Sequence, residues 1–162
     1  MRRRYAGGMD LNRILTEGYG PGAWHGADIK AAIADVPAAN AFTRPATGKG
    51  KARTPHNIAE IVMHHAFYVH SVRGRLVGTP IEPFVLEGED WFALDDGRKL
   101  SWKKITETLE SLQASLVTTV ADIEAGKTSS PLTPAEQLTL ALGITCHSAY
   151  HAGQIQLIKL EI

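Results

Sequence analysis

The chain has 162 residues and 17.6 kDa, and 44% of its residues are hydrophobic and 21% charged, a profile typical of one globular domain. Its 17 Lys and Arg balance its 17 Asp and Glu, so the basic surface expected of a nucleic-acid-binding protein is missing. The single cysteine, Cys146, excludes an intramolecular disulfide and a cysteine-rich zinc site.

No apolar run approaches the roughly 20 residues of a membrane-spanning helix. The arginines after Met1 are not followed by the apolar core of a secretory signal. We therefore expect a cytoplasmic protein with no membrane partner and no nucleic-acid partner.

The first predicted helix is interrupted. Residues 10–17 place Leu11, Ile14 and Leu15 on one side, and the Gly- and Pro-rich residues 18–22 then break the helix. Helical character resumes near Asp28 and continues to Pro37. Residues 44–53 are rich in Pro, Gly, Lys and Arg and indicate a loop.

The second predicted helix begins with Thr54 as N-cap and Pro55 in the first helical position. Its apolar stripe recurs at spacings of three and four: Ile58, Ile61, Val62, His65, Val69, Val72 and Leu76. Residues 78–80 end it. The long connection over residues 78–98 means that the second and third helices need not be adjacent and antiparallel.

The third predicted helix starts after Ser101 and runs to about Ala125, where Gly126 supplies a stop. The fourth starts at a capping box formed by Thr133 and Glu136 and reaches the C-terminus. We therefore predict an all-α protein, a four-helix bundle with a broken first helix, as a single domain over residues 1–162.

Two histidines of the fourth helix are the strongest candidates for metal ligands. His147 and His151 lie about 40° apart and about 6 Å along the axis. Both belong to the core-facing stripe Leu140, Ile144, His147, His151, Ile155, Ile158 and Ile162. Buried imidazoles need partners, which either a metal or backbone and water can supply, and two at this spacing favour the metal. Ser148 stands where a zinc peptidase has its catalytic Glu, which argues against that activity.

A third ligand is needed for firm binding, and the second helix offers His64 and His65. His65 is central in the apolar stripe, whereas His64 lies on its flank and can face an inter-helix groove, so spacing leaves both open. We expect His56 and His70 to be solvated and Cys146 to be a packed core thiol. Trp24 and His25 either line a pocket or cap the bundle, and Tyr150 either reaches the site edge or packs against the third helix.

Residues 58–64 (Ile-Ala-Glu-Ile-Val-Met-His) and residues 147–155 (His-Ser-Ala-Tyr-His-Ala-Gly-Gln-Ile) resemble segments of the DinB-like superfamily. This superfamily includes bacillithiol transferases and the metal-binding domain of mycothiol-dependent maleylpyruvate isomerase. Residues 22–26 (Gly-Ala-Trp-His-Gly) also resemble a segment of one subgroup. The resemblance implies up-down-down-up connectivity and one divalent metal, usually zinc or nickel. Transferred position by position, it implies the ligands His64, His147 and His151, with His65 in the core.

Three histidine ligands leave a coordination position open, as in catalytic metal sites. The resemblance therefore implies a metal-dependent transferase that activates a low-molecular-weight thiol, or a hydrolase that activates water, acting on a small-molecule substrate. Pocket-lining candidates are Trp24, His25, Tyr68 and Tyr150. The alternative is a non-catalytic binding or structural bundle that the metal stabilises. Relatives often dimerise, so a homodimer is also among the expectations.

Overall fold

The computed structural model describes residues 10–20, 22–45 and 56–162, which form six helices and no strand. The helices are α1 (Leu11–Tyr19), α2 (Ile29–Ile33), α3 (Ala38–Ala41), α4 (Ile58–Val77), α5 (Trp102–Glu124) and α6 (Pro134–Ile158). The all-α prediction is confirmed. Within the described residues, no helix combines the length and the apolar character that crossing a bilayer requires.

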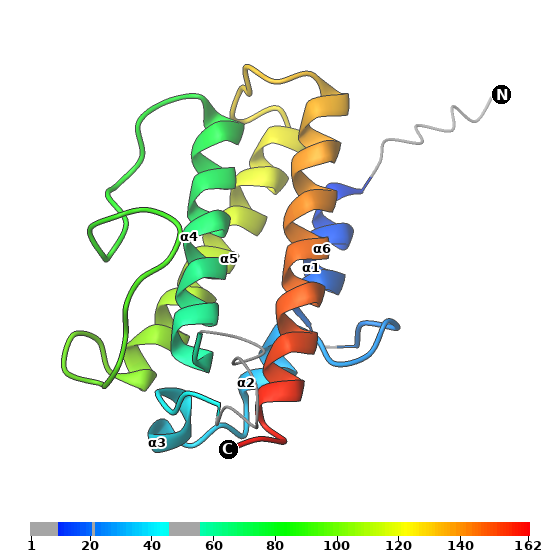
Figure 1. The fold of residues 1–162 in the computed structure, drawn as a ribbon. Coiled ribbons are helices and arrows are strands. Elements are labelled where there is room, and N and C mark those ends of the chain that lie inside the picture. Colours follow the sequence, from blue (N-terminus) through cyan, green and yellow to red (C-terminus); the bar gives the residue numbers. More distant parts are fainter. Residues whose placement is uncertain (1–9, 21, 46–55) are drawn as a thin grey trace, which may run out of the picture.

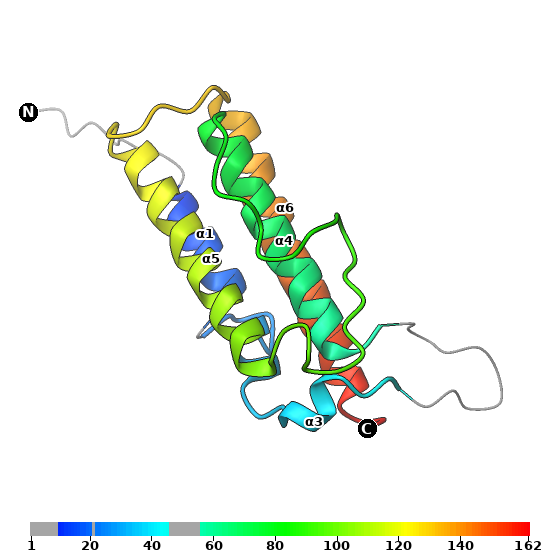
Figure 2. The same cartoon turned by 90° about the vertical axis from the view of Figure 1, so that its left-hand side faces the viewer.

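Helices α1, α4, α5 and α6 lie side by side, and α2 and α3 lie at the end where α6 finishes (Figure 1). Helix α4 packs against both α5 and α6, and α1 packs against α6 and α5. Helices α4 and α5 run in the same direction, while α6 runs in the opposite one (Figure 2). The connection between α4 and α5, residues 78–101, passes over the outer face of α4, and we call it the crossover.

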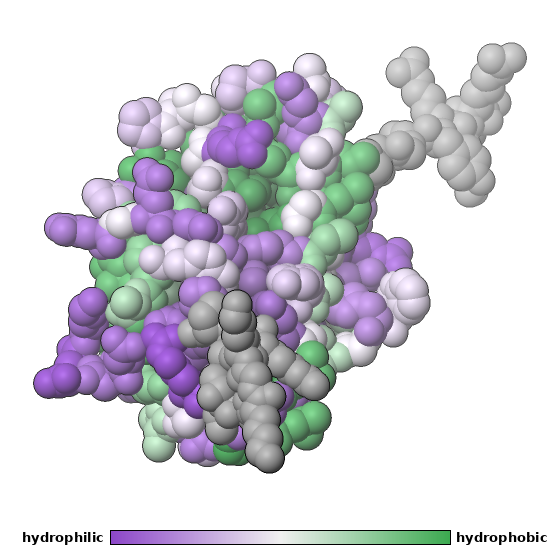
Figure 3. Space-filling view, viewed as in Figure 1, coloured by the Kyte–Doolittle hydropathy of each residue, from purple (hydrophilic) through white to green (hydrophobic). Residues whose placement is uncertain are grey.

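The predicted apolar stripe of α4 forms the core, together with five of the seven predicted stripe residues of α6; His147 is half-buried, and Ile162 lies beyond the end of α6. All seven stripe residues of α4 are buried, and so are Leu140, Ile144, His151, Ile155 and Ile158 of α6. The face shown in Figure 1 is mixed, with a hydrophobic region between the upper parts of α4 and α6 and both hydrophilic and hydrophobic atoms over the crossover (Figure 3). Helices α4 and α6 therefore pack against each other through mostly buried residues, with His147 half-buried between them.

The start of α4 differs from the prediction. The predicted cap residues Thr54 and Pro55 lie outside the described residues, and the N-cap is Asn57, whose Oδ1 accepts from the Glu60 backbone N–H at 2.9 Å. The Asn57 Nδ2 also donates to the Leu94 carbonyl at 2.7 Å. A single buried amide thus caps α4 and joins it to Leu94 in the later part of the crossover, a long-range contact that the local sequence does not reveal.

The first helix continues two residues further than predicted. Helix α1 includes Gly18 and ends at Tyr19. The missing side chain of Gly18 lets α1 approach α6. A Cβ at Gly18 would lie 2.5 Å from Thr145 Cγ2. The Gly18 carbonyl accepts from the Ser148 hydroxyl at 2.8 Å. The short helix α3 was not predicted.

Gly78 ends helix α4 as predicted. This glycine allows a test of its contribution to stability. Gly78 caps α4 with φ +66°, and a Cβ there would lie 2.4 Å from Pro131 Cγ. Gly126 after α5 has φ +70° but no atom within 4 Å of such a Cβ. Left-handed backbone costs an L-residue about 1–2 kcal/mol. We expect Gly126→Ala to lose about 1 kcal/mol and Gly78→Ala clearly more, measured by urea unfolding. Equal losses would contradict the steric contact with Pro131.

Candidate metal centre

Helices α4 and α6 bring three imidazole nitrogens to one point. The Nε2 atom of His147 lies 3.1 Å from His64 Nε2 and 2.9 Å from His151 Nε2. One ligand atom from each of these histidines lies within 4.8 Å of the others. Helical geometry accounts for the pair on α6, because residues four apart lie on one face. The packing of α4 against α6 adds His64.

The other ring nitrogens of His64 and His151 face oxygen acceptors. His64 Nδ1 lies 3.0 Å from both the backbone carbonyl and Oδ1 of Asp90 in the crossover. His151 Nδ1 lies 2.7 Å from Gln154 Oε1, one turn further along α6. A nitrogen that faces only acceptors must carry the proton. Both rings therefore hold their protons on Nδ1 and direct Nε2 lone pairs at His147.

This arrangement fits a divalent cation. His147 Nε2 faces two lone pairs, and a single proton on it satisfies only one of the two contacts. A cation accepts all three lone pairs. Tetrahedral coordination at the usual zinc–histidine distance separates ligand nitrogens by about 3.3 Å, close to the two separations from His147 Nε2. In protein metal sites the ligand histidines usually donate their other N–H to an oxygen acceptor, and these acceptors form the outer shell. Asp90 and Gln154 supply such acceptors here.

Burial keeps these rings neutral. Burial, followed by the neighbouring His64, lowers the pKa of His147 to about 4. Burial and then His147 lower the pKa of His151 to about 4. Burial also lowers the pKa of His64, against the opposing effect of Asp90. Neutral imidazole is the form that binds metal, so the protein holds its candidate ligands ready at neutral pH.

His65 belongs to the same cluster but not to the converging set. It is 1% exposed, and its Nδ1 lies 3.0 Å from Nδ1 of His147, on the side away from the other ligands. Burial and the neighbouring histidines hold the pKa of His65 well below its ordinary value. Of the two histidines that spacing left open, His64 therefore joins the converging nitrogens, and His65 lies behind His147.

The crossover contributes two residues that the sequence analysis did not place at the site. The Trp91 indole stacks on His64 at 3.9 Å between ring centroids, and His56 stacks on Trp91 at 3.6 Å. Asp90 has φ +66°, an uncommon conformation for a residue with a side chain, and it directs two oxygens at His64. In the sequence these two residues belong to an acidic stretch, residues 82–97. Such a stretch, even with a tryptophan in it, is too common to be assigned to a metal site.

A buried carboxylate anchors this part of the crossover. Glu60 is 2% exposed, accepts from the Leu94 backbone N–H at 3.1 Å and pairs with Arg44 at 2.6 Å. Although burial raises the pKa of Glu60, hydrogen bonds from Arg44, Leu94 and His56 outweigh it and keep the carboxyl below its ordinary pKa. His56, which we expected to be solvated, lies 3.1 Å from Glu60 and is stacked on Trp91.

Exposed aromatic side chains surround the histidines on one side. Tyr68 is 38% exposed and its ring centroid lies 5.0 Å from His147. Its hydroxyl donates to Asp90 Oδ1 at 3.1 Å. Tyr150 is 63% exposed, and its ring centroid lies 5.2 Å from His151. Tyr150 thus lies at the site edge, not packed against α5, and the histidines lie close to the protein surface.

The remaining candidates lie elsewhere. Trp24 is 89% exposed and His25 is also exposed, and among the described residues no ring contact joins either to the three histidines. Two further expectations were wrong. Cys146 is exposed, because its position on α6 points about 100° away from the core stripe. His70 is buried, because the crossover residue Phe84 covers it.

The comparison with known protein families agrees with this arrangement. Residues 23–155 match the DinB superfamily. No curated protein and no solved structure matches the chain. Because the match covers most of the chain, including α4 and α6, the protein belongs to the DinB superfamily.

Proposed function

We propose that this DinB superfamily protein binds one divalent cation through His64, His147 and His151 and uses it to activate a small thiol for transfer. The observation that carries the proposal is the convergence of three Nε2 atoms whose ring partners fix the lone pairs inward. Imidazole ligands suit zinc or nickel. When bound, such an ion lowers the pKa of a coordinated thiol, so that thiolate forms near neutral pH.

The surrounding residues support a site that a small molecule reaches. His147 is only half-buried, and Tyr68, Trp91 and Tyr150 are each at least one third exposed beside the ligands. Three protein ligands leave room for a substrate atom in a four-coordinate site. The aromatic rings provide apolar contact for the body of that substrate.

A thiol is favoured over water because a coordinated thiol ionises without a general base of its own. The Asp90 carboxylate already accepts from Tyr68 and faces His64. Ser148 follows His147 but is buried and donates to Gly18 on α1. Thiols ionise readily when coordinated, whereas hydrolysis of a substrate by water usually needs an additional base. The hydrolase therefore ranks second. A non-catalytic role for the metal is the third possibility.

Metal content tests the ligand assignment. Protein prepared without a metal-affinity tag and loaded with zinc should hold about one ion per chain, and His151→Ala should lose nearly all of it, because two ligands alone bind weakly. The matched control is His25→Ala, which changes an exposed histidine outside the cluster and should retain the metal. Full zinc occupancy in His151→Ala, measured by elemental analysis after dialysis, would refute the assignment.

Cobalt spectroscopy separates the possible activities. We expect cysteine added to the cobalt-substituted protein to produce a thiolate-to-cobalt charge-transfer band that is missing in His147→Ala. If azide perturbs the spectrum but thiols do not, the coordination position is open and the hydrolase is supported instead. If neither perturbs it, the coordination sphere is closed and the metal is structural.

A further inference from the structure

We propose that His65 is a positioning residue for His147: its Nδ1 accepts the Nδ1–H of His147 and so holds the His147 Nε2 lone pair toward the metal. This inference rests on the proposed function. It assigns a role to a fourth histidine that lies outside the converging ligand set.

Each of the three ligand rings has a different partner on Nδ1. His64 has Asp90, His151 has Gln154, and His147 has His65 at 3.0 Å. If Nε2 of His147 coordinates a cation, its proton must be on Nδ1, and that N–H points at His65 Nδ1. Ligand histidines depend on such a partner for ring orientation and tautomer. His65 therefore acts as the Nδ1–H acceptor for His147, as Asp90 and Gln154 do for His64 and His151.

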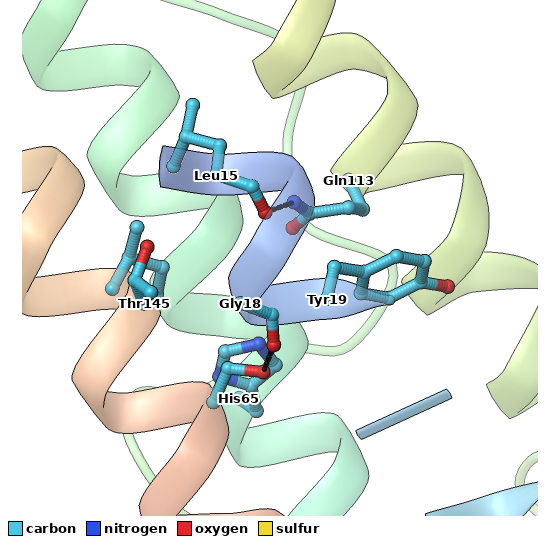
Figure 4. Close-up of a pocket in the computed structure, with 8 residues that line it drawn as sticks. Leu15, Gly18, Tyr19, His65, Gln113 and Thr145 are labelled. Carbon is cyan, nitrogen blue, oxygen red and sulfur yellow. Dashed lines mark hydrogen bonds between the residues drawn. The ribbon is translucent and has the colours of Figure 1, made fainter. Parts of the chain in front are cut away.

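The surroundings of His65 suit this role. The ring is 1% exposed on α4, so bulk water does not compete for its Nδ1. The ring also lines a cavity of about 10 Å³ together with Gly18, Gln113 and Thr145 (Figure 4). This volume is about what one water molecule needs. With Nδ1 as acceptor, a neutral His65 carries its proton on Nε2, and the cavity offers room for a water partner.

A residue that only fills the core would behave differently from a positioning residue. Leucine and asparagine have nearly the same shape, but only asparagine places an oxygen where the histidine Nδ1 was. Leucine at a buried position favours folding, whereas a buried amide without its full set of partners disfavours it. The positioning role therefore predicts that the two variants rank in opposite order for metal affinity and for stability. His65→Asn should bind metal more tightly than His65→Leu, although His65→Leu should be the more stable protein without metal.

The experiment measures zinc affinity by competition with a chromophoric chelator at pH 7.5 and stability of the metal-free forms by urea unfolding. We expect His65→Leu to bind zinc about 10–100-fold more weakly than the wild type, the range found for outer-shell changes. His65→Asn should recover most of this loss. If His65→Leu binds zinc as tightly as the wild type, the inference is overturned while the proposed function stands. If the wild type binds no zinc, the proposed function itself fails.

A second measurement does not depend on either variant folding. Long-range ¹H–¹⁵N spectra of the zinc-loaded wild type, labelled at histidine nitrogens, report which nitrogen of each ring carries the proton. We expect the proton of His147 on Nδ1 and that of His65 on Nε2. A proton on Nδ1 of His65 would overturn the inference, because this nitrogen would then be a donor and not an acceptor.

Discussion

Removing zinc from the loaded protein is expected to lower its free energy of unfolding by about 3 kcal/mol at pH 7.5. The ligands come from α4 and α6 and lie more than 80 residues apart in sequence, at His64 and His147, so only the folded chain presents all three. A ligand that binds the native state alone stabilises it by about 2.7 kcal/mol at one hundred times its dissociation constant. Urea unfolding with zinc and with excess chelator measures the difference.

The control for this experiment is His147→Ala, which loses the central ligand. Its unfolding midpoint should not respond to zinc or to chelator, whereas His25→Ala should respond as the wild type does. An equal response of the wild type and His147→Ala would mean that zinc acts at another site. No response of the wild type would contradict a stabilising role for the metal between α4 and α6.

The helices could be predicted because their signals are local. The capping box at Thr133 and Glu136, the stop at Gly78 and the start after Ser101 each depend on residues within a few positions. The core stripes could be predicted for the same reason, since helical periodicity alone decides which residues share a face. Asn57 shows the limit, because its amide binds Leu94 of the crossover, 37 residues away.

The candidate site could be predicted only in part. The pair on α6 follows from spacing, but the choice between His64 and His65 depends on how α4 is rotated against α6, which no local pattern contains. Here the resemblance supplied the residue that the structure places beside the other two. Asp90 and Trp91 could not be located, because a 24-residue connection without helices has no periodicity from which to derive its path over α4.

Trp24 and His25 show a related difficulty. An interrupted helix is a plausible place for a pocket, and aromatic and imidazole side chains suit one. In the structure, the crossover covers the side of α4 that carries His64. The rings of Trp91 and Tyr68 contact His64 there. Which of two irregular segments contacts the histidines depends on tertiary packing, which composition alone does not contain.

Acidification is expected to destabilise the metal-free protein by about 3 kcal/mol between pH 7 and pH 4 through His147 and His151 alone. Their pKa values in the folded chain are about 4, and in the unfolded chain they return to about 6.5. Between these pH values the unfolded chain binds protons that the folded chain does not, so stability falls as pH falls. The loss is smaller than the full shifts imply, because solvent reaches the half-buried His147 and screens its charge.

The double variant His147→Gln/His151→Gln isolates this effect, because other groups also titrate in acid, among them Glu60 with its lowered pKa. Glutamine stays neutral throughout, so the variant should lose about 2–3 kcal/mol less than the wild type between pH 7 and pH 4, whatever its stability at pH 7. Urea unfolding in the presence of chelator, repeated at half-unit steps of pH, gives both curves. Parallel curves would show that the two imidazoles are as easily protonated in the folded chain as in the unfolded one. They would then not be held neutral for a metal, and the electrostatic basis of the proposed site would be wrong even if zinc binds elsewhere.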